Sequence, residues 1–465
     1  MASGEPVRIP LLSYGQAALF GLGAAAAFHL AFTFPWAGFL IAVYVFCLFN
    51  LARAPSLRMA FYPGIGLGLL LFAPQLWFFW GLFGPFAFLL WTILALWIGG
   101  FLILARLCIG LCRRELAAAL VPCLWTGLEY VKSELYYLKF SWLAPGYAFS
   151  HEPARVLMGL WGMYGVGFML MLLSGALVLL PRRAAAVSGG LALALLGLLG
   201  NLPSGSPAAE RGAPLIAGVQ FEHPGESEVT ELLDRALEAH PRADVLVLSE
   251  YTFHGPVPET VRRWCREHGR YLVLGAVDRP AEIAPEFRNT AFVIGPDGKE
   301  IFKQAKSVPI QFFADGLPAE RQEVWDSPWG KIGICICYDL GYARVTDELI
   351  RKGARLLIVP TMDTARWGAH EHELHARVGP VRAAEYGVPI FRLASSGISQ
   401  AIRSDGTVAV RGAYPGQGEI VACRLGLADE TSLPADRYLA WPAVFIAAGC
   451  LLVLPWLRIR QRGRG

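Results

Sequence analysis

Long apolar stretches occupy both ends of this 465-residue chain, whereas its middle has the mixed pattern of a globular protein. Runs of about 20 mostly apolar residues, the length that crosses a bilayer, recur before residue 205 and return after residue 436. This pattern predicts seven membrane-spanning helices, then a globular region, then an eighth span. We expect the spans at residues 11–34, 36–52, 59–80, 85–106, 115–131, 156–180, 184–202 and 437–457.

Short runs rich in Val, Ile and Leu alternate with amphipathic stretches in the middle of the chain, as is typical of buried strands and covering helices. Strands are expected in the segments APLIAGVQ, ADVLVLSE, RYLVLGAV, NTAFVIG, KIGICICYD, ARLLIVPT and VPIFRLAS, and helices at 226–239, 258–268, 343–353 and 369–386. The turn at 296–298 predicts a hairpin, so the sheet is expected to be mixed. The pattern therefore predicts an α/β domain inserted into a multi-span α-helical membrane protein.

We expect three segments: a seven-helix transmembrane domain at 1–205, the α/β domain at 206–436, and an eighth helix with a basic tail at 437–465. Basic residues favour the cytoplasmic side of short loops. With a cytoplasmic N-terminus, every inside loop and the tail are basic, through Arg53, Arg58, Arg106, Arg113, Arg114, Arg182, Arg183, Arg458, Arg460, Arg462 and Arg464. The exception is the loop after the fifth span, which carries Lys132, Lys139 and Arg155 on the outside. The first span is too long for a cleaved signal peptide. We therefore expect a multi-pass protein of the bacterial cytoplasmic (inner) membrane with its α/β domain in the periplasm.

Composition narrows the classes of function. Charged residues make up 17% of the chain, against roughly 25% in soluble proteins, and the net charge of +4 does not suggest nucleic acid binding. The nine Cys show no repeated CxxC framework, which argues against a disulfide scaffold or a zinc site. His370 and His372 are two residues apart, the wrong spacing for one helix face, so neither they nor His375 are expected to bind metal. No P-loop or dinucleotide glycine pattern appears, and no cofactor is expected.

The segment after the fifth predicted span combines charges with aromatic residues. Glu129, Lys132 and Glu134 lie there among several Tyr, Phe and Trp residues. Ionisable groups at a membrane edge are costly unless they are paired or hydrated. One interpretation is a helix end with an interfacial aromatic belt. The other is part of a lipid-facing entrance to an active site.

Three chemically capable residues stand at or just after predicted strand ends: Glu250, Lys306 and Cys337. Strand ends are where α/β folds present reactive groups. Each residue alone has an ordinary structural explanation, as a turn residue, a solvated lysine or a packed thiol. Cys335 competes with Cys337 as a nucleophile, although it lies deeper in the strand. Lys303 competes with Lys306.

The order Glu, Lys, Cys and its local contexts resemble the nitrilase, or carbon–nitrogen hydrolase, superfamily. Lys306 follows Gly298 of the hairpin turn by eight residues, and GICICYD resembles the family's cysteine strand. Seven spans, such a domain and a final span resemble the apolipoprotein N-acyltransferase family. The segments WTGLEYVKSE…FSWLAPGY and RAAEYGVPIFRLASSGIS are also similar to motifs of that family. The resemblance implies an α-β-β-α sandwich for the α/β domain.

The resemblance also implies roles for the residues. Glu250 would act as general base, Cys337 as nucleophile, and Lys306 as oxyanion stabiliser, supported by Tyr338 and Asp339. A free thiol is only slightly ionised at neutral pH, so a base beside it is a chemical need. The implied reaction is ping-pong. Cys337 takes an acyl chain from a phospholipid as a thioester and passes it to the amine of a diacylated apolipoprotein.

The chain departs from the family pattern after its lysine. The family reads K-x-x-L-V-P-F-G-E there, with a second catalytic Glu, whereas this chain reads KSVPIQFFADGLPAE. Asp315, Glu320 or Glu323 could substitute for that Glu. The family's NDAWFG becomes MDTARWG, and its Tyr-Glu pair becomes Tyr338-Asp339. Candidate substrate-loop residues are Asp315, Trp367, Glu385 and Trp142.

The implied partners are a phospholipid donor, a diacylated apolipoprotein acceptor and the bilayer, with the chain acting as a monomer. Both substrates carry acyl chains, and burying each CH₂ is worth roughly 0.8 kcal/mol, so an enzyme at the bilayer avoids the cost of extraction. The alternatives are a membrane-anchored extracytoplasmic amidase of the same superfamily, which would use water as acceptor, and a catalytically silent paralogue.

Overall fold

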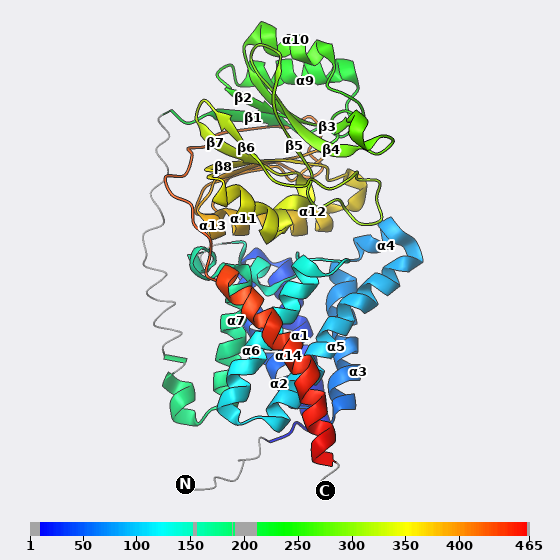
Figure 1. The fold of residues 1–465 in the computed structure, drawn as a ribbon, viewed down its shortest axis with the longest axis vertical. Coiled ribbons are helices and arrows are strands. Elements are labelled where there is room, and N and C mark those ends of the chain that lie inside the picture. Colours follow the sequence, from blue (N-terminus) through cyan, green and yellow to red (C-terminus); the bar gives the residue numbers. More distant parts are fainter. Residues whose placement is uncertain (1–9, 152–155, 188, 191–211, 463–465) are drawn as a thin grey trace. The chain divides into compact units, whose positions relative to one another are not determined.

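The computed structural model describes residues 10–151, 156–187, 189–190 and 212–462. The chain divides into two compact units (Figure 1). The first, here called the membrane unit, comprises Met1–Leu202 and Pro434–Gly465. The second, the catalytic unit, comprises Pro203–Leu433. Each unit is described by itself.

The membrane unit is helical. Its elements are α1 (Tyr14–Thr33), η1 (Pro35–Leu40), α2 (Ile41–Leu51), α3 (Leu57–Gln75), α4 (Phe78–Phe83), η2 (Gly84–Phe86), α5 (Ala87–Leu111), α6 (Arg114–Tyr130), η3 (Val131–Leu135), η4 (Pro145–Phe149), α7 (Val156–Leu179) and α14 (Asp436–Arg462). Within the described residues, five helices are long and apolar enough to cross a membrane: α1, α3, α4 with α5, α7 and α14. Pro35–Leu51 is a shorter apolar helix. The span expected at 115–131 corresponds to α6, which has 17 residues and is not among the five. The span expected at 184–202 lies mostly outside the described residues.

Small residues allow the helices of this unit to pack closely, as they do in membrane bundles. A side chain at Gly68 of α3 would collide with Ala95 of α5, and one at Gly127 of α6 would collide with the backbone of Ala443 in α14. Helix α7 kinks at Gly162, whose φ is 73°. Beyond the kink, the backbone N–H of Tyr164 donates to Asp436, 2.9 Å away, at the start of α14.

Two six-stranded sheets form the centre of the catalytic unit. The first has the order β12-β1-β2-β3-β4-β5 and the second β11-β10-β9-β8-β7-β6. The strands are β1 (Leu215–Val219), β2 (Val245–Val247), β3 (Tyr271–Asp278), β4 (Arg288–Ile294), β5 (Glu300–Ala305), β6 (Val324–Ser327), β7 (Gly330–Ile334), β8 (Leu356–Thr361), β9 (Ile390–Ala394), β10 (Gln400–Ile402), β11 (Val408–Arg411) and β12 (Ile420–Arg424). Both sheets contain parallel and antiparallel pairs, as expected for a mixed sheet.

Helices cover the outer faces of both sheets (Figure 1). On the first sheet lie α9 (Glu226–Ala239) and α10 (Glu259–His268), whose apolar side chains join the core of that sheet. On the second lie α11 (Ala343–Arg351), α12 (Ala369–Ala376) and α13 (Val378–Tyr386). The sheets face each other closely, because a side chain at Gly218 of β1 would collide with Leu393 of β9. The layers therefore run helix, sheet, sheet, helix, which confirms the predicted fold class.

Most predicted strands and helices are present, but one predicted helix is divided in two and four short strands were not predicted. Strands β4 and β5 form the hairpin, with Gly298 at a φ of 75°. The helix expected at 369–386 is two helices, α12 and α13, which meet at Arg377. The short strands β6, β10, β11 and β12 had no expectation from the sequence. Their burial patterns are mixed or their length is three residues, so they lack a clear hydrophobic signal.

Candidate active site

Three loops that follow strands bring Glu250, Lys306 and Cys337 together in the catalytic unit. Glu250 comes after β2, Lys306 directly after β5, and Cys337 after β7. Their exposed fractions are 1%, 1% and 2%. The ammonium of Lys306 lies 2.8 Å from Oε1 of Glu250. This is the grouping that the sequence order predicted.

Glu250 is held on both carboxylate oxygens. Asn289 donates to Oε1 over 2.6 Å, and the backbone N–H of Met362 donates to Oε2 over 2.8 Å. Gly275 on β3 makes room for this loop, because a side chain there would collide with the backbone of Glu250 and Tyr251. Burial raises the pKa of Glu250, and the attraction of Lys306 reverses only part of that rise.

Cys337 begins a tight turn, η6 (Cys337–Gly341), with a φ of 52°. Left-handed backbone at a non-glycine residue is strained by about 1–3 kcal/mol and gathers at functional sites. Burial raises the pKa of the Cys337 thiol, the Glu250 carboxylate raises it further, and Lys306 lowers it. Cys335 is also fully buried, but the charges that act on it are Asp339 and Arg382. The charges that surround each thiol therefore favour Cys337 over Cys335 as the thiol beside the base.

Asp315 is a second carboxylate on Lys306. Its Oδ2 lies 2.8 Å from the lysine ammonium and accepts from the Ile310 N–H, also over 2.8 Å. Its Oδ1 accepts from Tyr251 and Asn289 over 2.8 Å each. Burial would raise the pKa of Asp315, but Lys306 and these hydrogen bonds outweigh it and hold the pKa below its usual value.

The two other candidates for the missing second Glu lie elsewhere. Glu320 is 84% exposed at its side chain and pairs with Arg288. Glu323 is 46% exposed and pairs with Arg321 and Lys352. Of the three acids considered, only Asp315 reaches Lys306. The two carboxylates raise the pKa of Lys306 well above its usual value, although burial acts to lower it, so the ammonium stays charged.

Asp339 ties the lysine loop to the cysteine turn. Its carboxylate accepts from the backbone N–H groups of Ser307, Val308 and Ile336, at 3.0, 2.7 and 3.2 Å. Burial raises the pKa of Asp339 to about 6. Tyr338 is buried beside it, with its ring edge-to-face against Tyr342. Both predicted support residues thus lie within the turn that carries Cys337.

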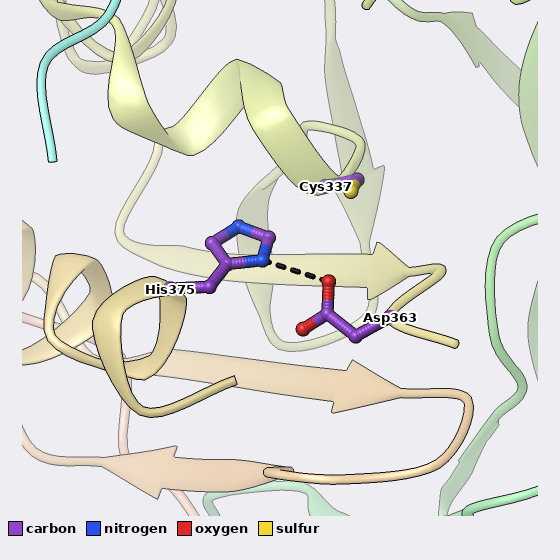
Figure 2. A group of neighbouring side chains, drawn as sticks. All are labelled: Cys337, Asp363 and His375. Carbon is purple, nitrogen blue, oxygen red and sulfur yellow. Dashed lines mark hydrogen bonds and ion pairs between the residues drawn. The ribbon is translucent and has the colours of Figure 1, made fainter. Parts of the chain in front are cut away.

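A fourth acid, Asp363, approaches Cys337 from the loop after β8 (Figure 2). One ligand-type atom each from Cys337, Asp363 and His375 lies within 4.8 Å of the others. Nδ1 of His375 is 2.8 Å from Asp363, and Arg392 holds the other oxygen of that carboxylate. Burial lowers the pKa of His375 to about 4, so its ring is neutral at pH 7.

This group has the residue types of a metal site but not its electrostatics. The carboxylate of Asp363 is shared between Arg392 and His375, and Lys306 adds a second permanent cation near the thiol. A metal cation would have to displace a guanidinium and withstand a buried ammonium, which is unfavourable. The network instead secures the loop at Met362, whose N–H binds Glu250 and whose carbonyl lies 4.0 Å from the Cys337 sulfur.

The remaining sequence candidates have other surroundings. Glu385 lies in α13 rather than in a loop, fully buried, 2.5 Å from Arg382. Arg382 in turn donates to the carbonyls of Leu340 and Gly341, so this ion pair holds the end of the turn that carries Cys337. Lys303 is 47% exposed at its side chain and pairs with Asp278.

The two tryptophans lie in different units. Trp367 ends the short helix η7 (Ala365–Trp367), and its ring lies 6.5 Å from that of Phe313. Trp142 is buried within the membrane unit.

Sequence reasoning missed Asn289, Tyr251 and the Asp363–His375–Arg392 network. A polar residue near the start of an apolar strand was a usable signal for Asn289, because a buried amide there needs partners. The other contacts depend on loops that meet only in three dimensions.

A family model described as carbon-nitrogen hydrolase matches residues 176–429, more than half of the chain. The chain therefore belongs to the carbon–nitrogen hydrolase family. A second model, the apolipoprotein N-acyltransferase N-terminal domain, matches residues 18–176. The two matches in succession confirm the resemblance to apolipoprotein N-acyltransferases within the nitrilase superfamily.

Relatives agree with both matches. The chain is 27% identical to an apolipoprotein N-acyltransferase of Geobacter metallireducens over 380 residues, which cover 70% of this chain and 72% of that one. It is 33% identical to omega-amidase NIT2-B of Xenopus laevis over 128 residues, which cover 24% of this chain and 46% of that one. The chain thus spans about half the length of that amidase.

Among solved structures, Nit3 of Saccharomyces cerevisiae aligns with 46% of this chain and 90% of its own, at 20% identity and a TM-score of 0.39. An amidase of Nesterenkonia sp. aligns with 47% of this chain and 92% of its own, at 19% identity and a TM-score of 0.40.

Proposed function

We propose that this protein transfers an acyl chain from a phospholipid, through a thioester on Cys337, to the terminal amine of a diacylglyceryl-cysteine in an apolipoprotein. The observation that carries the proposal is the buried contact of Glu250 with Lys306 beside the Cys337 thiol, in a chain with five membrane-length apolar helices. The matches to apolipoprotein N-acyltransferases over both units support lipoprotein N-acylation.

Proton movement in the first step follows from the electrostatics. Glu250 has a raised pKa, which suits a general base near neutral pH. It takes the Cys337 proton, and the thiolate attacks the ester carbonyl of the lipid. The charged Lys306 and a backbone N–H of the cysteine turn, for which Tyr338 is the candidate, stabilise the oxyanion. The carbon–oxygen bond then breaks, and the leaving alcohol takes the proton from Glu250.

The second half-reaction reverses these roles. The acceptor amine attacks the thioester carbonyl, Glu250 removes a proton from the amine, and the Cys337 thiolate leaves. The protonated Glu250 returns that proton to the Cys337 thiolate, which restores the starting state for another donor. Asp315 keeps Lys306 charged and oriented throughout, through its 2.8 Å contact. In this account, Asp315 takes the place of the second Glu that the family carries after its lysine.

Acyl transfer agrees better with the whole chain than amide hydrolysis does. The omega-amidase match covers only 24% of this chain, whereas the acyltransferase matches include the membrane unit. A membrane unit gives an enzyme direct access to substrates with acyl chains. We further propose that the catalytic unit faces the periplasm, as the basic loops indicate, and that the chain acts as a monomer.

The test is intact mass spectrometry of the purified protein after incubation with phosphatidylethanolamine. We expect an added acyl mass that hydroxylamine removes. The adduct should be absent from Cys337→Ala and should persist in the matched variant Cys335→Ala. A wild-type protein that never acquires the mass, with any phospholipid class, would overturn the thioester mechanism. Release of free fatty acid without transfer to a diacylated peptide would instead support the hydrolase.

A further inference from the structure

Two buried carboxylates in the catalytic unit, those of Glu250 and Asp315, share the same donors. Nζ of Lys306 lies 2.8 Å from an oxygen of each acid. The amide of Asn289 donates one N–H to each acid, over 2.6 Å to Glu250 and 2.8 Å to Asp315. Each acid also accepts one backbone N–H over 2.8 Å. Two ionised carboxylates around one ammonium carry a net negative charge, so one of the two acids is favoured to take up a proton.

The remaining neighbour of each acid differs. The thiol of Cys337 is hydrogen-bonded to Glu250, and its proton is the one that must move. The hydroxyl of Tyr251 donates to Asp315 over 2.8 Å. Burial and the Asp315 carboxylate raise the pKa of Tyr251, so the phenol keeps its proton at neutral pH and remains a donor. A donor that never gives up its proton stabilises the ionised form of the acid that it contacts.

The backbone at Tyr251 brings two consecutive side chains to one site. Its φ is 54°, a left-handed conformation that is strained for a residue other than glycine. In an extended strand, consecutive side chains point to opposite faces. Here Glu250 contacts Lys306 and the next side chain contacts Asp315, which contacts the same lysine. The strain is therefore found where the chain turns Tyr251 towards Asp315.

The ring of Tyr251 is held on its outer side by histidines. It stacks on His254 with ring centroids 5.8 Å apart, and His254 stacks on His223 at 5.7 Å. Both histidines are exposed, whereas Tyr251 is half-buried. The ring thus has packing of its own, separate from the hydrogen bond of its hydroxyl.

We propose that Tyr251 is a positioning residue of this site: its hydroxyl keeps Asp315 as the ionised partner of Lys306 and leaves Glu250 as the acid that takes the Cys337 proton. The inference rests on the proposed roles of Glu250 and Cys337. Paired acids with different surroundings divide the acid and base roles in this way. Tyr251 acts through Asp315 rather than on a reacting atom.

The other ionisable groups near the pair do not make the same distinction. Lys306 contacts both acids at the same distance. The Asp339 carboxylate accepts backbone N–H groups, and Asp363 is paired with Arg392 and His375, so none of these groups donates to either acid in the contacts of the described residues.

Loss of the hydroxyl should appear in the pH dependence. In Tyr251→Phe, ionised Asp315 loses a donor, so the state with both acids ionised becomes less favourable and the pair holds a proton to higher pH. A protonated Glu250 cannot accept from Cys337. The acid limb of the pH–rate profile should therefore move up by about one pH unit, the effect of one hydrogen bond to a buried carboxylate. The rate on the plateau above that limb should stay within about tenfold of wild type, because phenylalanine keeps the ring and its stacking.

The experiment follows two rates against pH in the full-length protein in detergent. One is acyl-enzyme formation from phosphatidylethanolamine. The other is alkylation of Cys337 by iodoacetamide, which needs a deprotonated thiol but no lipid. Mass spectrometry measures both. If no acyl adduct forms on wild type while the alkylation limb still shifts in Tyr251→Phe, the acyl-transfer proposal fails and the role of Tyr251 stands.

Matched variants identify the route of the effect. Tyr271→Phe removes a hydroxyl from a ring that packs against Trp325 and Trp329, and it should leave the limb in place. Asp315→Asn should move the limb to lower pH, because the charge that raises the pKa of Glu250 is gone. Adding Tyr251→Phe to Asp315→Asn should then move it no further.

Three results would overturn the proposal. The first is an unchanged profile in Tyr251→Phe. The second is an equal loss of rate at every pH, which would leave Tyr251 with a structural role. The third is the same upward shift in the Asp315→Asn background, which would show that the hydroxyl does not act through Asp315.

Discussion

The two units each bury a lysine against a glutamate at the same distance, 2.8 Å, yet the surroundings differ. Lys132 in the membrane unit has Glu129 and an aromatic ring, and it lies in the π-helical segment η3. Lys306 in the catalytic unit has two carboxylates and lies beside a thiol. The backbone shows a further difference, because Cys337 itself and Tyr251, the residue after Glu250, have left-handed backbone. An ion pair alone therefore does not identify a catalytic centre. The catalytic centre is identified by three further features: a second carboxylate on the lysine, strained backbone, and a nucleophilic thiol beside the pair.

The largest effect should come from Glu250→Gln. The amide keeps the shape of the site but cannot take the Cys337 proton, so we expect acyl-enzyme formation to slow by roughly 10³- to 10⁴-fold. Single-turnover mass spectrometry measures that rate. Glu129→Gln in the membrane unit should slow acyl-enzyme formation far less. If Glu250→Gln formed the acyl-enzyme at a rate within tenfold of wild type, the two ion pairs would not differ in the way proposed.

Lys306→Met should be the most destabilising change in the catalytic unit. It leaves Glu250 and Asp315 buried without their cation, and breaking a buried pair costs about 3–5 kcal/mol. Thermal unfolding in detergent checks this expectation. The double variant Lys306→Met with Asp315→Asn should recover part of the loss, since one stranded charge is removed. If the double variant recovered no thermal stability, the loss in Lys306→Met would not come from the unpaired Asp315 carboxylate.

Asp339 gives a pH dependence with a defined sign. Burial raises its pKa from the usual 3.8 to about 6, so the folded state binds a proton more tightly than the unfolded state. Stability from this group is present at low pH and is lost as pH rises through the folded pKa, by at most about 3 kcal/mol. Asp339→Asn should therefore gain stability relative to wild type between about pH 4 and pH 7. A difference that is constant across that range would contradict the assignment.

Asp315→Asn should lower acyl transfer by roughly 10- to 100-fold, the effect expected from loss of one buried charge contact. The variants Glu320→Gln and Glu323→Gln are matched controls, because both acids are exposed and neither reaches Lys306. Their rates should stay within about twofold of wild type. Equal losses in all three variants would remove the distinction between Asp315 and the other acids.

The smallest effect should come from Lys303→Gln. This lysine pairs with Asp278 on an exposed part of the sheet, and such pairs contribute about 0–1 kcal/mol. Unfolding temperature and acyl-transfer rate should both stay close to wild type. A large loss of activity would revive Lys303 as the catalytic lysine.

The sequence by itself determined the elements whose signal is local. Apolar runs long enough for a bilayer indicated the membrane helices, and short buried runs indicated β1, β2, β3, β4, β7, β8 and β9. The order Glu250, Lys306, Cys337 at strand ends was also readable, because α/β folds expose reactive groups there. Only the tertiary structure decided which acid meets Lys306, since Asp315, Glu320 and Glu323 lie within a few residues of one another and differ in where their loop turns. It likewise decided that Asp363, His375 and Arg392 form one network. Asp363 lies in the loop after β8, His375 in α12 and Arg392 in β9, and no periodicity of the chain records a contact between such separate segments.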